Sequence, residues 1–105
     1  MELAGSHKDT GKSRIDLIDP LFIMGVADVL AFGSAKYGDR NWTGGIAVSK
    51  LFGSLQRHLW KFWNGEDIDP ESGLYHLDHA ACNLMMIGWM LQDRPDADDR
   101  FRRNG

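Results

Sequence analysis

The residues between Arg57 and Asn83 include most of the side chains in this chain that could do chemistry. Acidic residues crowd one short stretch, and two histidines one helical turn apart follow it. These acids and histidines are Glu66, Asp67, Asp69, Glu71, His76 and His79. Such groups are costly to cluster unless water, a metal ion or a phosphate ligand satisfies them. Because apolar residues at helical spacing flank the cluster, we expect a metal-assisted site for a polyanionic substrate, held between two helices.

The two histidines are a weak signal of a ligand site until their neighbours are considered. His76 and His79 lie one turn apart on a predicted helix, close enough to bind one ion or one phosphate. Taken alone, such a pair is more often a pair of hydrogen-bonded packing residues. Asn83 continues their stripe, and His58 lies on the preceding helix, which a short loop would place alongside. These neighbours favour a functional site.

The acidic loop allows more than one interpretation. Asp67, Asp69 and Glu71 alternate as at the start of an EF-hand calcium loop, but Pro70 and the missing final glutamate argue against one. Asp69 and Glu71 could also belong to a capped helix start, where acids complement the helix dipole. Glu66 and Asp67 follow a helix C-terminus, where the dipole disfavours anions, and this placement indicates a cation nearby.

An earlier loop, with the sequence GDRNWTGG, carries Arg40, Asn41 and Trp42. Arginine can hold phosphate, asparagine can pair with a base edge, and an indole can stack on a purine. The alternative is a structural loop with a tryptophan in the core. Phosphate-binding charge could also come from basic residues elsewhere, if folding brings them together. These are Lys12, Arg14, Lys36 and Arg57.

Three helices are predicted to position these residues, over about 20–38, 49–64 and 73–93. Asp19 caps the first, Ser49 is a plausible cap of the second, and glycines end the first two. The stripes expected to pack are Leu21, Met24, Ala27 or Asp28, and Ala31; Leu51, Phe52, Leu55, Leu59, Phe62 and Trp63; and Leu74, Leu77, Ala81, Leu84, Gly88 and Leu91. No β alternation is present, so we predict an all-α bundle with an extended arm at 1–18, a domain at 19–93 and a polar tail at 94–105 containing a short helix.

Length and composition limit the domain size, the partners and the location that we expect for the protein. A chain of 105 residues forms one small domain whose limited core favours a homodimer or higher oligomer. The net charge of −3 argues against binding extended nucleic acid. The single cysteine, Cys82, fits a reducing cytoplasm and a buried position better than a nucleophile. The apolar run 84–91 is too short to span a membrane, so we expect a soluble cytoplasmic protein.

Three blocks of sequence, GKSRIDLIDP, AFGSAKYGDRNW and RHLWKFWNGEDIDPESGLYHLDHAACN, resemble the dATP/dGTP diphosphohydrolase family common in phage genomes. The resemblance covers about residues 8–92. That family is similar to the all-α MazG-type pyrophosphohydrolases, which are oligomeric helical bundles that use divalent metal. The resemblance implies conversion of a purine deoxynucleoside triphosphate to monophosphate and pyrophosphate in the cytoplasm of an infected host cell.

The resemblance also implies roles for individual residues. Magnesium, manganese or cobalt would activate water for in-line attack on a phosphorus atom. Metal ligands are expected among Glu66, Asp67, Asp69, Glu71, His76 and His79, of which Glu66, Asp69, Glu71 and His79 are expected to be catalytic. The residues expected to bind substrate are Lys12, Arg14, Lys36, Arg40, Asn41, Trp42, Arg57 and His58.

One departure from the MazG type bears on this assignment. MazG-type enzymes carry metal on helical ExxE and ExxD pairs, whereas this chain has His76 and His79 where ExxD is expected. Imidazole suits manganese, cobalt or zinc better than magnesium. Either the site is rebuilt around histidines, or the histidines bind phosphate without hydrolysis. In the second case the protein would be a phage sponge that sequesters a nucleotide immune signal. The four loop acids favour the enzyme.

Overall fold

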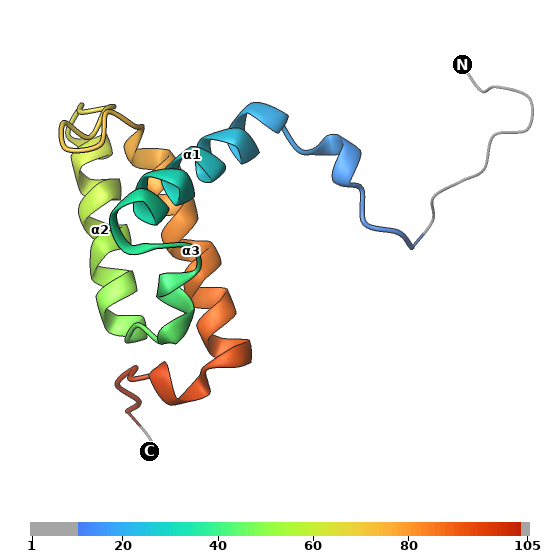
Figure 1. Cartoon of the computed structure of the whole chain (residues 1–105), viewed down its shortest axis with the longest axis vertical. Helices are drawn as coiled ribbons and strands as arrows, with labels where there is room; N and C mark the ends of the chain where they lie inside the picture. The colour runs from blue at the N-terminus through green and yellow to red at the C-terminus, as the bar shows by residue number, and fades with distance from the viewer. Residues whose placement is uncertain (1–10, 104–105) are drawn as a thin grey trace, which may run out of the picture.

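The computed structural model describes residues 11–103, and this part of the chain is helical (Figure 1). It contains three α-helices, α1 (Pro20–Tyr37), α2 (Val48–Trp63) and α3 (His76–Asp93), and three short 3-10 turns. The turns are Ile15–Leu17, Asn41–Gly44 and Pro95–Ala97. The only β pairing within residues 11–103 is a single bridge between Ile68 and Tyr75. The predicted all-α class is therefore confirmed.

Helix α1 begins and ends as the sequence predicts. The Asp19 side chain accepts a hydrogen bond of 3.0 Å from the backbone N–H of Leu21, and Pro20 follows as the first helical residue. Gly38 ends the helix with a φ of 93°, a conformation that favours glycine. Residues 11–18 lead away from the helices (Figure 1). The rest of the predicted arm lies outside the described residues.

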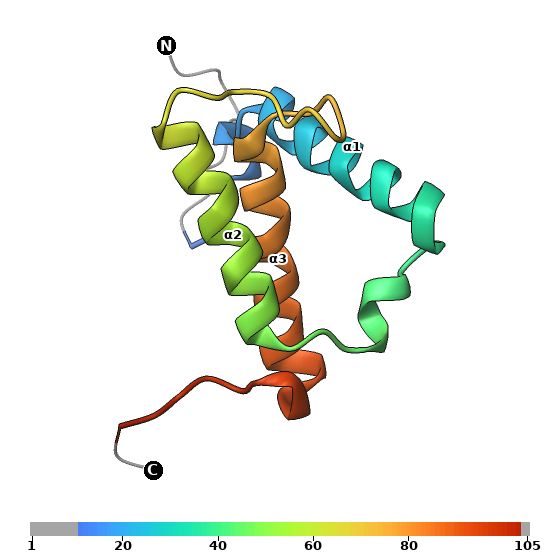
Figure 2. The ribbon, with the colours of Figure 1, turned by 90° about the vertical axis from the view of Figure 1, so that its left-hand side faces the viewer.

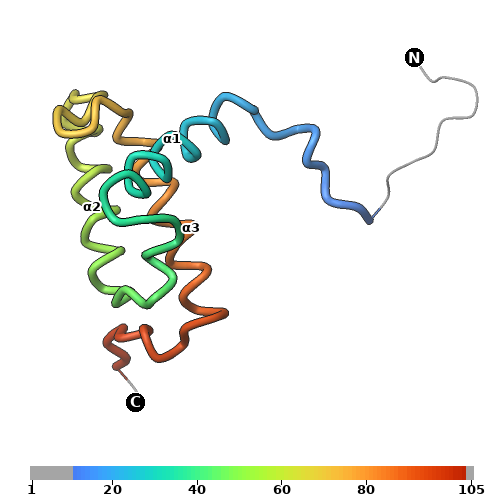
Figure 3. The backbone as a smooth tube through the Cα atoms, in the orientation of Figure 1, coloured from blue at the N-terminus to red at the C-terminus, as the bar shows by residue number. Residues whose placement is uncertain are grey.

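Helices α2 and α3 lie side by side and antiparallel, and α1 crosses them near the end where the α2–α3 loop reverses the chain (Figures 2 and 3). The core lies at the other end of this pair. Val48, Leu51, Met90 and Ala97 are buried together there. Ala97 comes from the last 3-10 turn, so part of the predicted polar tail packs into the core.

The predicted packing stripe of α3 is wrong. Leu77, Leu84 and Leu91 have exposed fractions of 40%, 58% and 39%. The residues that are buried instead are His76, Ala80, Cys82 and Met90. Helix α3 has apolar residues on several sides, so periodicity alone does not select the side that α2 covers. The burial predicted for Cys82 is confirmed.

The predicted faces of the other two helices need correction as well. In α1, Leu21 and Met24 are 78% and 59% exposed, and the helix buries Gly25 and Val29 instead. In α2, Leu51 and Leu55 are buried as predicted, whereas the other members of the stripe are not. Glycine lets α1 approach α3 closely at a position that a count of apolar side chains overlooks.

Two helix starts also differ from the prediction. Ser49 does not cap α2; instead, Asp99 from the C-terminal segment accepts hydrogen bonds from the backbone N–H of Ser49, at 2.8 Å, and from its hydroxyl. Helix α3 begins at His76 rather than near residue 73. The preceding residues form a turn, in which the Asp69 carboxylate accepts from the N–H of Glu71 at 3.0 Å. Among residues 11–103, no helix has the length and hydropathy that crossing a bilayer requires.

Candidate active site

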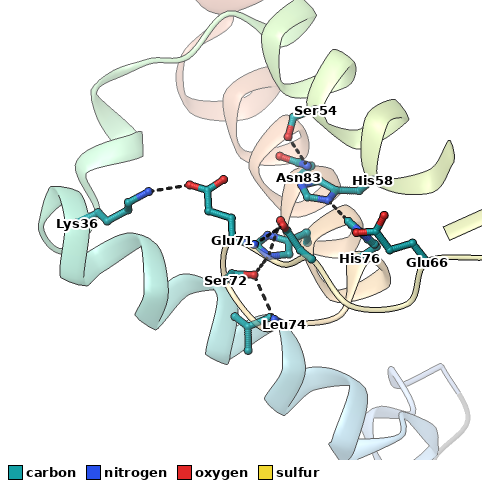
Figure 4. Close-up of polar contacts among 11 residues, drawn as sticks. Lys36, Ser54, His58, Glu66, Glu71, Ser72, Leu74, His76 and Asn83 are labelled. Atoms are coloured by element: carbon teal, nitrogen blue, oxygen red, sulfur yellow. Dashed lines mark hydrogen bonds and ion pairs between the residues drawn. The ribbon is translucent and has the colours of Figure 1, made fainter. Parts of the chain in front are cut away.

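The antiparallel register of α2 and α3 brings polar residues together across the helix pair. His58 of α2 and His79 of α3 stack with ring centroids 4.5 Å apart and planes 5° from parallel. Four residues away in each helix, Ser54 accepts a hydrogen bond of 3.1 Å from the amide of Asn83. One side of the helix pair therefore carries a column of polar residues (Figure 4).

The α2–α3 loop adds a carboxylate to the stacked histidines. Oδ2 of Asp69 lies 3.7 Å from Nε2 of His79, and both side chains are almost covered, with exposed fractions of 13% and 12%. His58, Asp69 and His79 each offer one ligand atom, and these atoms lie within 4.8 Å of one another. Two imidazoles and one carboxylate are a donor set for manganese, cobalt, iron or zinc rather than magnesium.

His58, His76 and Glu66 form a hydrogen-bonded chain on the side of His58 away from the cleft. Nδ1 of His58 lies 2.9 Å from Nδ1 of the fully buried His76, and Nε2 of His76 lies 3.3 Å from Oε1 of Glu66 (Figure 4). A carboxylate only accepts, so His76 donates through Nε2 and accepts through Nδ1. His58 then carries its proton on Nδ1, and the lone pair of its Nε2 is available to an ion.

The surroundings keep the two stacked histidines neutral. Burial lowers the pKa of His58 to about 4, and the neighbouring His79 and His76 add to this effect. Burial also lowers the pKa of His79, although Asp69 opposes the shift. Burial alone would raise the pKa of Asp69, but the Glu71 N–H and the histidines outweigh it and lower that pKa. The site therefore holds neutral imidazoles beside a carboxylate, the protonation states that metal binding requires.

A cleft of about 960 Å³ opens beside this group, between the C-terminal half of α1 and the α2–α3 pair. This volume is typical of sites for small molecules and cofactors. The two stacked histidines lie at one end of the column that lines it. Ser54 and Asn83 come next, and the apolar layer of Leu51 and Met86 follows. Along the helix pair the lining thus changes from the histidines through Ser54 and Asn83 to Leu51 and Met86, with Lys50 beside Leu51.

Charged residues line the α1 side of the cleft. Lys36 Nζ lies 3.0 Å from Oε1 of Glu71, which joins α1 to the α2–α3 loop (Figure 4). Arg40 also lines the cleft, and it is the only residue other than glycine within 11–103 with a positive φ, at 54°. Left-handed backbone at such a residue costs on the order of 1 kcal/mol and concentrates at functional positions.

Trp42 has a structural role in addition to lining the cleft. Its ring meets Trp89 edge to face, with centroids 5.1 Å apart, and it packs against the buried core. The structural interpretation that the sequence left open is therefore supported for this residue.

The structure gathers some of the predicted site residues and separates others. Those lining the cleft are Lys36, Arg40, Asn41, Trp42, His58, Glu71 and His79. Those that do not line it are Lys12, Arg14, Arg57, Glu66, Asp67, Asp69 and His76. Arg14 pairs instead with Asp16 at 2.8 Å. Glu66 and His76 stand behind His58, and Asp67 contributes its backbone carbonyl, which accepts from the N–H of His76.

Sequence reasoning missed parts of this site. It assigned His58 to substrate and did not group it with Asp69 and His79, which the structure brings together with it. Sequence spacing does not show this grouping, because it depends on how the α2–α3 loop folds against α2. Sequence reasoning also missed Ser54 and Ser72. The hydroxyl of Ser72 lies 2.7 Å from Nε2 of His79. Ser54 could have been found from its position one turn before His58. The sequence carries no comparable signal for Ser72.

The fold and site together define a small all-α protein with a two-histidine, one-carboxylate group at one end of a cleft. The chain belongs to the family described as dATP/dGTP diphosphohydrolase, N-terminal, whose model matches residues 2–100. It is 44% identical over 98 residues to a dATP/dGTP diphosphohydrolase of Salmonella phage PMBT28. The match covers 93% of this chain and 33% of the relative, so the chain spans about a third of that relative's length. No solved structure matches the chain.

Proposed function

We propose that this chain is a metal-dependent pyrophosphohydrolase that converts dATP or dGTP to the monophosphate and pyrophosphate. The observation that carries the proposal is the convergence of His58, Asp69 and His79 at one end of a cleft of small-molecule size. Membership of a family described by this activity supports it, as does the relative that bears the same name.

The metal we propose is manganese or cobalt, bound by His58, Asp69 and His79. This set is smaller than the set predicted from sequence, since Glu66, Asp67, Glu71 and His76 lie outside the group whose ligand atoms converge. When bound, the ion would polarise a phosphate oxygen and lower the pKa of a water molecule. His79 Nε2 and Asp69 Oδ2 lie 3.7 Å apart, a separation that would allow both atoms to bind one ion.

The other residues of the cleft would hold and orient the triphosphate. Lys36 and Arg40 provide positive charge for phosphate oxygens. We assign Glu71 to accept a proton from the attacking water, because its carboxylate belongs to a residue that lines the same cleft and is not one of the three proposed metal ligands. The apolar layer beyond Asn83 gives the base a surface.

The test is to incubate the protein with each nucleoside triphosphate and magnesium, manganese or cobalt, and to separate the products by ion-exchange chromatography. Monophosphate and pyrophosphate from the purine deoxynucleotides, with manganese or cobalt above magnesium, are expected. The Asp69→Asn and Glu71→Gln variants should lose turnover. Asp67→Asn is the matched control and should keep its turnover, because the side chain of Asp67 is exposed and is not one of the proposed metal ligands. Unchanged nucleotide with every metal would overturn the proposal and favour a sequestering protein.

A further inference from the structure

The hydrogen-bonded pair of Ser54 and Asn83 has a position in the cleft that the chemistry above does not use. Both residues are partly buried, and both line the cleft between the stacked histidines and the apolar layer. Figure 4 shows them beside His58, on the two facing helices. Resting on the proposed function, we propose that this pair binds the sugar of the nucleotide through its 3′-hydroxyl.

The rise per residue along α2 and α3 gives the distances between successive layers of the cleft. An α-helix rises about 1.5 Å per residue, so Ser54 and Asn83 lie about 6 Å along the helix axes from His58 and His79. The layer of Leu51 and Met86 lies roughly one turn further. A nucleotide whose phosphates are held at the histidine end presents its sugar next and its base last. The sugar therefore falls at Ser54 and Asn83, and the base falls at the apolar layer.

The hydrogen-bonding capacity of the pair matches a hydroxyl group. Asn83 donates one N–H to Ser54, which leaves its carbonyl oxygen as an acceptor and the Ser54 O–H as a donor. Within residues 11–103, the bond between them is the only side-chain hydrogen bond that either residue makes. A sugar hydroxyl both donates and accepts, and a deoxynucleotide has only the 3′-hydroxyl on its ring.

A site built to bind a hydroxyl rejects an analogue that lacks it, because its own polar atoms are then left unpaired. The experiment therefore compares dATP with 2′,3′-dideoxy-ATP in the wild type and in the Asn83→Leu and Ser54→Ala variants. Wild-type kcat/KM should favour dATP by about tenfold or more, the size of one lost hydrogen bond in a covered site. In both variants the ratio should fall to about one. Gln92→Leu, which removes an exposed amide of α3 outside the cleft, is the control and should keep the wild-type ratio.

The same comparison is made by calorimetric titration of the two nucleotides, which needs no turnover. If no metal supports hydrolysis, the proposed function fails, whereas a tenfold difference in Kd that vanishes in the two variants still supports the sugar site. The proposal is overturned if the wild type treats both nucleotides alike. It is also overturned if both variants keep the wild-type ratio, or if neither nucleotide binds.

Discussion

At the level of single residues, Glu66 reaches the proposed metal group (His58, Asp69 and His79) only through His76, so its effect on a bound ion would be indirect. Its carboxylate fixes the proton positions of two histidines in series and so leaves Nε2 of His58 free for an ion. Supporting residues of this kind usually contribute ten- to a hundredfold to metal affinity. We therefore expect Glu66→Ala to weaken cobalt binding by about 10–100-fold, measured by titration of the visible absorption of the metal.

The neighbouring acid offers a matched control for this prediction. The Asp67 side chain is exposed and outside the metal group, and only its backbone carbonyl bonds to His76. Asp67→Ala should therefore leave cobalt affinity close to that of the wild type. Equal losses in the two variants would show that general negative charge, rather than the hydrogen-bonded chain, sets the affinity.

The pKa values of the histidines predict how metal binding responds to pH. Protons compete with metal for imidazole, and an ordinary histidine is half protonated near pH 6.5. Burial lowers the pKa of His79 below this value and that of His58 to about 4. Cobalt binding should therefore persist as the pH falls through 6.5 and be lost only at more acidic values. A midpoint at or above pH 6.5 in a pH titration of the cobalt spectrum would contradict this expectation.

At the level of helices, Gly25 controls how closely α1 approaches α3. A Cβ atom at this position would overlap the carboxylate of Asp78, whereas a Cβ at Gly33, in the same helix, would meet nothing within 4 Å. Gly25→Ala should therefore destabilise the protein by about 1–3 kcal/mol, the usual cost of overpacking. Gly33→Ala should stabilise it by roughly 0.5–1 kcal/mol, because alanine favours a helix interior. Urea unfolding of both variants measures the difference, and equal effects would contradict the close approach.

The helices also show what the sequence could and could not predict. Their number, order and approximate ends follow from local signals such as Asp19, Pro20 and Gly38, which act through neighbouring backbone. The side that each helix buries is decided by its partners, so the exposed Leu84 was wrongly placed in a packing seam. The spacing of His79 and Asn83 is local, and both line the cleft, whereas His76 of the same predicted stripe is buried outside it. The pairing of His58 with Asp69 depends on how the loop folds, which spacing does not reveal.

At the level of the whole molecule, the C-terminal segment forms hydrogen bonds with the first turn of α2. Asp99 accepts from both the N–H and the hydroxyl of Ser49, and these bonds lower the pKa of its carboxyl group. A lowered pKa means that the bonds stabilise the fold above the unfolded pKa and are lost as the pH falls through the folded one. Asp99→Ala should therefore lower the thermal midpoint at pH 7, as loss of a helix cap does, and the difference should disappear in strong acid. Asp16→Ala, which removes an exposed pair with Arg14, is the control and should change the midpoint less.

Apolar surface outside the cleft predicts that the chain associates with itself. A groove lined by Phe22, Leu59, Leu77 and Leu84, among others, is apolar, and Trp63 nearby in sequence is 86% exposed. Exposed apolar grooves can mark sites of protein–protein contact, and a small core gains stability from a second copy. Sedimentation velocity should therefore give a mass above that of one chain, falling toward the monomer in Leu84→Glu. A monomer at every concentration of the wild type would contradict the prediction.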